Sequence, residues 1–236
     1  MICAALRRLD FLKSMIALSC LGAGLALLPA SLSAQEKSIP EEIEWTWEVR
    51  PMHLDPALPN VLLIGDSLTR NMFPEVNQDL QGIANVYLFA ASTSVGDPRL
   101  TCQIADFVKM ERVRFRVVHF NNGMHGWKYT EAQFRAAFPA YLHEVEKLVP
   151  SRSDLIWATI TPVLPTASGG ATNARIDARN AIALPFVRAA GIRVDHQHAL
   201  MLKHQDMHKD PVHFNNKGSD IEGDQAAAMI QQALKS

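Results

Sequence analysis

The chain has 236 residues, of which 48% are hydrophobic and 20% are charged, and its formal net charge at pH 7 is −1. This length allows one domain with a sizeable apolar core. The basic residues are scattered and form no Lys/Arg block, so we predict no nucleic-acid partner.

Residues 1–34 have the order of a cleavable signal peptide: a basic start, an apolar middle at 15–28 and small residues at 31–34. The apolar part is shorter than the about 20 residues of a comfortable membrane span, although a retained anchor is the alternative. We expect cleavage after Ser33 or Ala34, a periplasmic or secreted location, and no stable membrane insertion afterwards. Cleavage would leave Cys102 as the one cysteine, which excludes an intramolecular disulfide, and a net charge of −3.

Short apolar runs alternate with longer amphipathic stretches in the rest of the chain, which is typical of parallel βαβ units. After an N-terminal arm at 35–59, the domain at 60–236 has predicted strands at 60–64, 85–90, 113–120, 155–160 and 191–194. Helices are predicted at 69–80, 99–110, 130–148, 174–190 and 217–234. The first half of the third strand alternates with arginine, so that half is expected outside the sheet. We therefore predict an α/β fold with a parallel sheet of about five strands.

Two tryptophans, Trp45 and Trp47, lie in the arm. They could face a ligand, but aromatic residues in such an arm more often pack over the domain that follows, and we favour packing.

The first strand ends in Gly65, Asp66 and Ser67. In an open parallel sheet the ligand crevice lies beyond the carboxyl ends of the strands. Glycine permits a tight turn there, which would place the Ser67 hydroxyl and its unpaired N–H at the start of a helix. The plainer interpretation is that Asp66 and Ser67 only cap this helix.

A serine nucleophile needs a base, and the base needs an orienting partner. Asp210 and His213 stand three residues apart before the last predicted helix. In a turn, the carboxylate can contact one imidazole nitrogen while the other faces Ser67. Asp-Pro is also an ordinary turn signal, but both motifs together favour a catalytic interpretation.

These two motifs resemble those of the GDSL, or SGNH, hydrolases, over residues 60–236. The resemblance implies a flavodoxin-like three-layer α/β/α sandwich. It also implies that Ser67 is the nucleophile, His213 the base and Asp210 its orienting acid. The run Ser94-Val-Gly-Asp97 is similar to the family's second block, which implies that the Gly96 N–H lies in the oxyanion hole.

The third block departs from the family pattern, which has an asparagine that completes the oxyanion hole. Alignment on Gly123 places His125 at that position, similar to a bacterial secreted subgroup with histidine there. A neutral histidine can donate one N–H, and Asn121 or Asn122 could supply the donor instead. The expected oxyanion hole is Ser67, Gly96 and His125, with Asn122 as the alternative; the residues expected beside the substrate are Asp66, Asn121 and Trp127.

The resulting hypothesis is a secreted serine esterase. By resemblance it would hydrolyse short-chain acyl esters of a small molecule or a carbohydrate, without metal or organic cofactor. O-acetyl groups on a carbohydrate are the first expectation, and short-chain lipid-like esters are the second. The Gly-x-Ser-x-Gly motif of the α/β-hydrolases is absent. Two alternatives stay open: an acyltransferase with the same three residues, and a non-catalytic carbohydrate-binding protein on the same fold.

Five histidines fall within residues 196–213, a density that can indicate a metal site. The set contains no cysteine and lacks the His-Glu-x-x-His pattern. We therefore predict no metal for His196, His198, His204, His208 and His213.

Overall fold

A computed structural model describes residues 37–236 of the chain. The predicted signal peptide at 1–34 lies outside the described residues. In the part that the structure describes, no helix is long and apolar enough to cross a membrane.

The predicted apolar strands form a parallel sheet. Its spatial order is β3-β2-β4-β5-β6, with one further strand beside β3. The parallel strands are β2 (Asn60–Gly65), β3 (Asn85–Ala91), β4 (Val117–Phe120), β5 (Leu155–Ala158) and β6 (Arg193–Asp195). This is the flavodoxin-like order, in which the crevice lies at the carboxyl ends of β2 and β4, where the order reverses.

Strand β2 explains why its sequence is a continuous apolar run. Successive side chains of a strand point to opposite faces. Leu62 and Ile64 belong to one buried cluster, Val61 and Leu63 belong to another, and all four are 0% exposed. A strand covered on both faces has no polar side to alternate with.

The N-terminal arm contributes a sixth strand that the sequence analysis did not predict. Strand β1 (Thr46–Val49) pairs antiparallel with β3 at the edge of the sheet. An edge strand with one partner buries little, and Trp47 keeps 51% of its surface exposed, so no apolar run marks it. Trp45 packs against the core cluster beneath α2 (Ser67–Asp79), as expected. The Arg70 guanidinium lies over both tryptophan rings.

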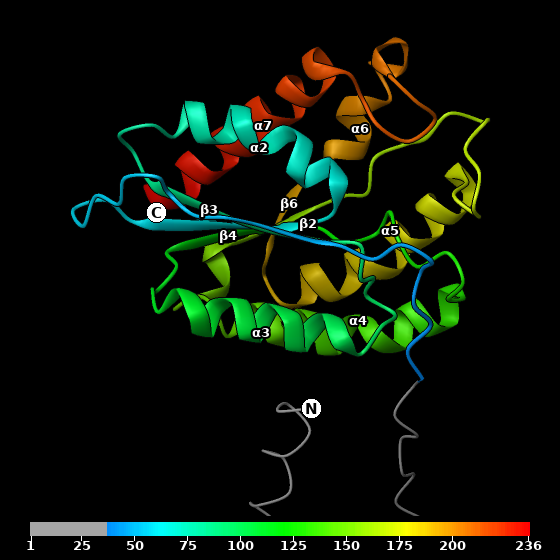
Figure 1. Cartoon of the computed structure of the whole chain (residues 1–236), viewed down its shortest axis with the longest axis horizontal. Coiled ribbons are helices and arrows are strands. Elements are labelled where there is room, and N and C mark those ends of the chain that lie inside the picture. Colours follow the sequence, from blue (N-terminus) through cyan, green and yellow to red (C-terminus); the bar gives the residue numbers. More distant parts are fainter. Residues whose placement is uncertain (1–36) are drawn as a thin grey trace, which may run out of the picture. The chain divides into compact units, whose positions relative to one another are not determined.

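Helices cover both faces of the sheet, which confirms the three-layer sandwich. Figure 1 shows α2, α6 and α7 on one face and α3, α4 and α5 on the other. The helices are α2 (Ser67–Asp79), α3 (Arg99–Glu111), α4 (Glu131–Glu146), α5 (Asn173–Ala189), α6 (Gln197–Met201) and α7 (Asn216–Leu234), with short 3-10 turns at Arg152–Asp154 and Gln205–Met207.

The third predicted strand is shorter than its sequence range. Strand β4 begins at Val117, so residues 113–116 lie outside the sheet, as the arginine alternation indicated. Arg116 turns outward and forms an ion pair with Asp154.

Candidate active site

The turn after β2 brings Ser67 to the start of α2. A Cβ on Gly65 would lie 1.9 Å from the Thr69 hydroxyl oxygen, so only glycine fits this turn. Asp66 is the N-cap of α2, where its carboxylate accepts a hydrogen bond from the Leu68 N–H at 3.0 Å. Its other oxygen accepts from the Met124 N–H at 3.2 Å. The capping interpretation of Asp66 is thus confirmed, and its carboxylate also fixes the loop after β4.

Ser67 and His213 are in hydrogen-bond contact although 146 residues separate them. The Ser67 Oγ lies 2.7 Å from the His213 Nε2. On the opposite side of the ring, the His213 Nδ1 lies 3.0 and 2.9 Å from the two carboxylate oxygens of Asp210. A hydroxyl, an imidazole and a carboxylate therefore form one continuous relay.

The turn that carries Asp210 and His213 fixes their relative positions. One oxygen of Asp210 accepts hydrogen bonds from the backbone N–H groups of Val212 at 2.9 Å and His213 at 2.7 Å. Burial would raise the pKa of Asp210, but these bonds and the imidazole outweigh burial and hold the pKa below its ordinary value. Asp210 is therefore ionised at neutral pH, so it can only accept a hydrogen bond, which the Nδ1–H of His213 donates.

The second block forms a turn after β3. The Asp97 N–H donates to the Ser94 carbonyl at 2.9 Å. Among the backbone hydrogen bonds that join loops and turns within residues 37–236, none uses the N–H of Gly96 or of Ser67. Both donors therefore remain available to a ligand at the carboxyl end of the sheet.

Asn122 has both side-chain atoms in contact with this second block. Its Oδ1 accepts from the Val95 N–H at 3.1 Å, and its Nδ2 donates to the Thr93 carbonyl at 2.9 Å. The Asn122 side chain therefore connects the loops after β3 and β4, and its role in an oxyanion hole stays a prediction.

Two arginines of α5, Arg175 and Arg179, donate hydrogen bonds to backbone carbonyls of the loop at 121–129. The sequence analysis missed both. The guanidinium of Arg179 is 1% exposed and donates to the carbonyls of Gly123, His125 and Gly126 at 3.0, 2.8 and 3.0 Å. Arg175 donates to the carbonyls of Trp127 and Tyr129 at 2.9 and 2.8 Å, and its Nε donates to Glu131. Their spacing of four residues on one helix face was the available signal.

The third-block side chains have distinct surroundings. The His125 ring makes an edge-on contact with Trp45 of the N-terminal arm, with 5.8 Å between the ring centroids. Trp127 is partly buried beneath the Arg179 guanidinium, 4.0 Å from the ring centroid. The predicted substrate contacts of Asp66, Asn121 and Trp127 stay predictions.

A small cavity of about 20 Å³ lies behind the first turn of α2. Thr161, Gln197 and Glu222 line it and are almost fully buried, and each has a side-chain oxygen without a hydrogen-bond partner in residues 37–236. Burial, with the charges of Asp66 and Asp195 added, raises the pKa of Glu222 well above its ordinary value of 4.5. Such a carboxyl is favoured in its neutral form.

The histidine-rich segment does not gather its imidazoles around one point. His198 Nδ1 lies 2.8 Å from the Ile160 carbonyl, and His208 packs on Phe214 with ring centroids 4.1 Å apart. His213 belongs to the relay described above.

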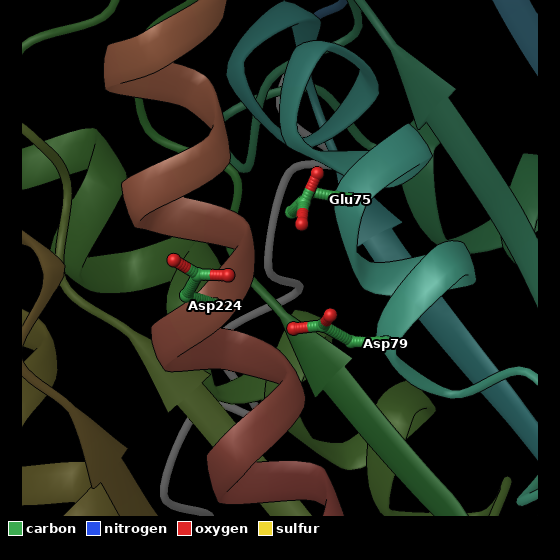
Figure 2. A group of neighbouring side chains, drawn as sticks. All are labelled: Glu75, Asp79 and Asp224. Carbon is green, nitrogen blue, oxygen red and sulfur yellow. The ribbon is translucent and has the colours of Figure 1, made fainter.

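One group of carboxylates in the described residues is close enough to share an ion. It comprises Glu75, Asp79 and Asp224, with oxygen atoms within 4.8 Å of one another. Figure 2 shows Glu75 and Asp79 on α2 facing Asp224 on α7. Asp79 is the last residue of α2, so this group lies towards the opposite end of the helix from Ser67.

The structure is similar to solved structures of lipases and esterases. A lipase/acylhydrolase from Enterococcus faecalis has a TM-score of 0.60 and 19% identity, over 74% of this chain and 96% of that chain. The acetylxylan esterase Axe2 from Geobacillus stearothermophilus has a TM-score of 0.58 and 14% identity, over 73% and 94%. A member of the lipolytic protein G-D-S-L family from Veillonella parvula has a TM-score of 0.59 and 13% identity, over 73% and 98%.

This chain has the fold of the SGNH hydrolases. No family model and no curated protein matches the sequence. The SGNH likeness therefore establishes the fold, and the histidine-containing subgroup stays a prediction. The catalytic roles of Ser67, Asp210 and His213 therefore rest on their contacts in this structure.

Proposed function

We propose that this protein is a serine esterase with Ser67 as nucleophile, His213 as base and Asp210 as orienting acid. The observation that carries the proposal is the relay itself, with Ser67 Oγ 2.7 Å from His213 Nε2 and His213 Nδ1 2.9 Å from Asp210. Only 7% of the Ser67 surface is exposed, yet its hydroxyl contacts the base directly. A non-catalytic binding protein has no need for this relay.

The reaction follows from the atoms in the relay. His213 Nε2 removes the Ser67 proton as Oγ attacks the acyl carbon, and the imidazolium then protonates the leaving alcohol. Water, deprotonated by the same nitrogen, then attacks the acyl carbon, and the imidazolium returns the proton to the Ser67 Oγ as the acyl bond breaks and the acid leaves. The free N–H groups of Ser67 and Gly96 are the donors for the negative charge on the tetrahedral intermediate, aided by the N-terminus of α2.

The substrate class we propose is an O-acetyl or other short-chain acyl ester, with carbohydrate first. The support is the SGNH fold that this chain shares with an acetylxylan esterase. An alcohol acceptor in place of water would make the same residues an acyltransferase, so the assay should measure both free acid and transferred ester.

The decisive test compares wild type with Ser67→Ala on p-nitrophenyl acetate and butyrate. Ser153→Ala is a matched control, because Ser153 is exposed and lies before the amino end of β5. We expect turnover in wild type and control and none in Ser67→Ala. A fluorophosphonate probe should add its mass to the Ser67 peptide, and turnover that survives in Ser67→Ala would refute the assignment.

We also propose that residues 1–34 direct export and are removed. N-terminal sequencing of protein from the periplasm or medium should begin at residue 34 or 35. Retention of residue 1 in the exported protein would favour the anchor.

A further inference from the structure

The small cavity behind the first turn of α2 has a mixed lining. Leu68, Met72 and Ala158 are apolar, and the remaining residues of the wall are polar: Thr69, Asn121, Thr161, Gln197 and Glu222. An apolar cavity stays dry, whereas a polar cavity with enough room holds water that hydrogen-bonds to its walls. One water needs about 10–15 Å³ of such space. The volume of about 20 Å³ is therefore room for one water molecule.

Four of the polar lining residues carry an enclosed oxygen atom that has no hydrogen-bond partner within residues 37–236. These atoms are Asn121 Oδ1, Thr161 Oγ1, Gln197 Oε1 and Glu222 Oε2. The side chains of Thr161, Gln197 and Glu222 are almost fully buried, so bulk solvent cannot serve them. Native proteins pair nearly all of their buried polar atoms, with protein or with ordered water. Four such oxygens around one cavity therefore indicate a common ligand.

The contacts of Gln197 fix which way its amide points. Its Nε2 donates to Asp195 Oδ2 at 3.0 Å and to the Glu222 carbonyl at 2.9 Å. Burial would raise the pKa of Asp195, but hydrogen bonds from His119 and Gln225 outweigh burial and lower it. Asp195 is therefore ionised at neutral pH and can only accept. An amide flip would set oxygen against oxygen, so Gln197 Oε1 is the atom that needs a donor from the cavity.

Glu222 and Thr161 supply donors. Burial and the negative charges of two nearby aspartates raise the pKa of Glu222 well above 4.5, which favours the neutral carboxyl with its O–H. The Thr161 hydroxyl has one O–H, which rotates to suit its partner. The amide oxygens of Gln197 and Asn121 can only accept. The wall thus has two donors and two acceptors, and none of these four oxygens is hydrogen-bonded to another.

We propose that this cavity is a binding site for a single water molecule, which accepts hydrogen bonds from the O–H groups of Thr161 and Glu222. The water donates its two protons to the amide oxygens of Gln197 and Asn121. Water has two donors and two acceptor sites on one heavy atom, so it satisfies all four oxygens. A metal cation would offer no acceptor to the two O–H groups, and it would require Glu222 in its charged form.

The water site joins several segments behind the nucleophile. Its four oxygens come from Asn121 after β4, Thr161 after β5, Gln197 in α6 and Glu222 in α7. The first turn of α2, which begins with Ser67, completes the wall. A bridging water is enthalpically nearly as good as a direct hydrogen bond, so the water holds these segments together around the turn. The site goes beyond the proposed esterase chemistry and can be tested apart from it.

The sign of one isosteric change tests the proposal. Thr161→Val keeps the shape of the side chain and removes its O–H. With the water bound, this change takes a donor from it and should raise the equilibrium constant for unfolding about 5- to 150-fold in urea melts at pH 5. With a dry cavity, the same change removes an unpaired polar atom and should lower that constant. A constant that falls, or that stays within about 2-fold of wild type, would overturn the proposal.

A matched control separates this effect from the change of residue type. Thr166→Val makes the same replacement at an exposed threonine of the same loop, and its unfolding constant should stay within about 2-fold of wild type. Sodium is the alternative ligand. Wild-type melts in sodium chloride and in choline chloride at equal ionic strength should coincide. Stabilisation by sodium that Glu222→Gln abolishes would assign the cavity to a cation and refute the water site.

A direct readout needs no variant. A crystal structure of the wild-type protein should show one ordered water in the cavity, at about 2.5–3.2 Å from the oxygens of Thr161, Gln197 and Glu222. Clear density for these side chains with no peak between them would contradict the proposal, and so would a rearrangement that pairs them directly. These outcomes do not depend on esterase turnover, so failure of the esterase assignment and failure of the water site are distinguishable.

Discussion

Arg179→Met should destabilise the protein strongly, because it removes the donor that three loop carbonyls share. The guanidinium binds the carbonyls of Gly123, His125 and Gly126 at 2.8 to 3.0 Å. Burial lowers the pKa of Arg179 to about 10, so the group remains charged at neutral pH. Each buried carbonyl left without a donor costs about 1–3 kcal/mol, and the avoided burial of a charge offsets part of this sum. Three carbonyls at this cost, less the avoided burial of a charge, give an expected net loss of about 2–4 kcal/mol.

The assay is urea unfolding of wild type, Arg179→Met and Arg179→Lys at pH 7. Lysine keeps the charge but not the planar fork that reaches several carbonyls, so it should recover only part of the loss. Arg175→Met is the comparison, because Arg175 is more exposed, with 26% of its side chain accessible, and should cost less. A loss below about 1 kcal/mol for Arg179→Met would refute the view that Arg179 holds this loop.

Three further changes test the geometry of the site and its surroundings. Gly126→Ala should lower kcat and the free energy of unfolding more than Gly82→Ala does. Both glycines have φ near +70°, but only a Cβ at 126 would meet a close neighbour. Activity assays and urea melts of the two variants compare them. Asp210→Asn should lower kcat by about 10³- to 10⁴-fold at unchanged fold by circular dichroism, because the amide donates to His213 Nδ1 and enforces the wrong tautomer. Glu222→Gln should match wild type in urea melts at pH 4 and exceed it increasingly above about pH 4.5. The folded-state pKa of Glu222 is raised, so wild-type stability is present below the unfolded pKa and falls as pH rises, by about 1.4 kcal/mol for each pH unit that separates the unfolded from the folded pKa.

Sequence patterns predicted the strands that are buried on both faces, because such strands are continuous runs of apolar residues. Strands β2 and β3 are covered on both faces and appear as apolar runs. Strand β1 has one pairing partner and exposed side chains, so hydrophobic periodicity could not indicate it. The start of β4 at Val117 could be predicted because the arginines before it cannot enter the core.

The candidate relay could be predicted for a different reason. Ser67 follows the first strand of the domain, and His213 and Asp210 share one turn, so short motifs located them. The Arg179 contacts left only the four-residue spacing from Arg175 as a signal, and that spacing does not show which groups the guanidinium binds, since its partners are backbone carbonyls. A carbonyl is the same on every residue, and sequence letters do not show where one lacks a partner.

The third block depends on a property that a sequence motif does not record, namely the protonation state of a side chain. Alignment placed His125 at the donor position, but whether the ring can donate depends on its protonation state. In the structure that state is biased by Glu41, which lies 84 residues earlier in an arm with no recognisable motif. Motif alignment therefore identifies which residue stands at a position, but the charge that biases its protonation state can come from a distant part of the chain that carries no motif.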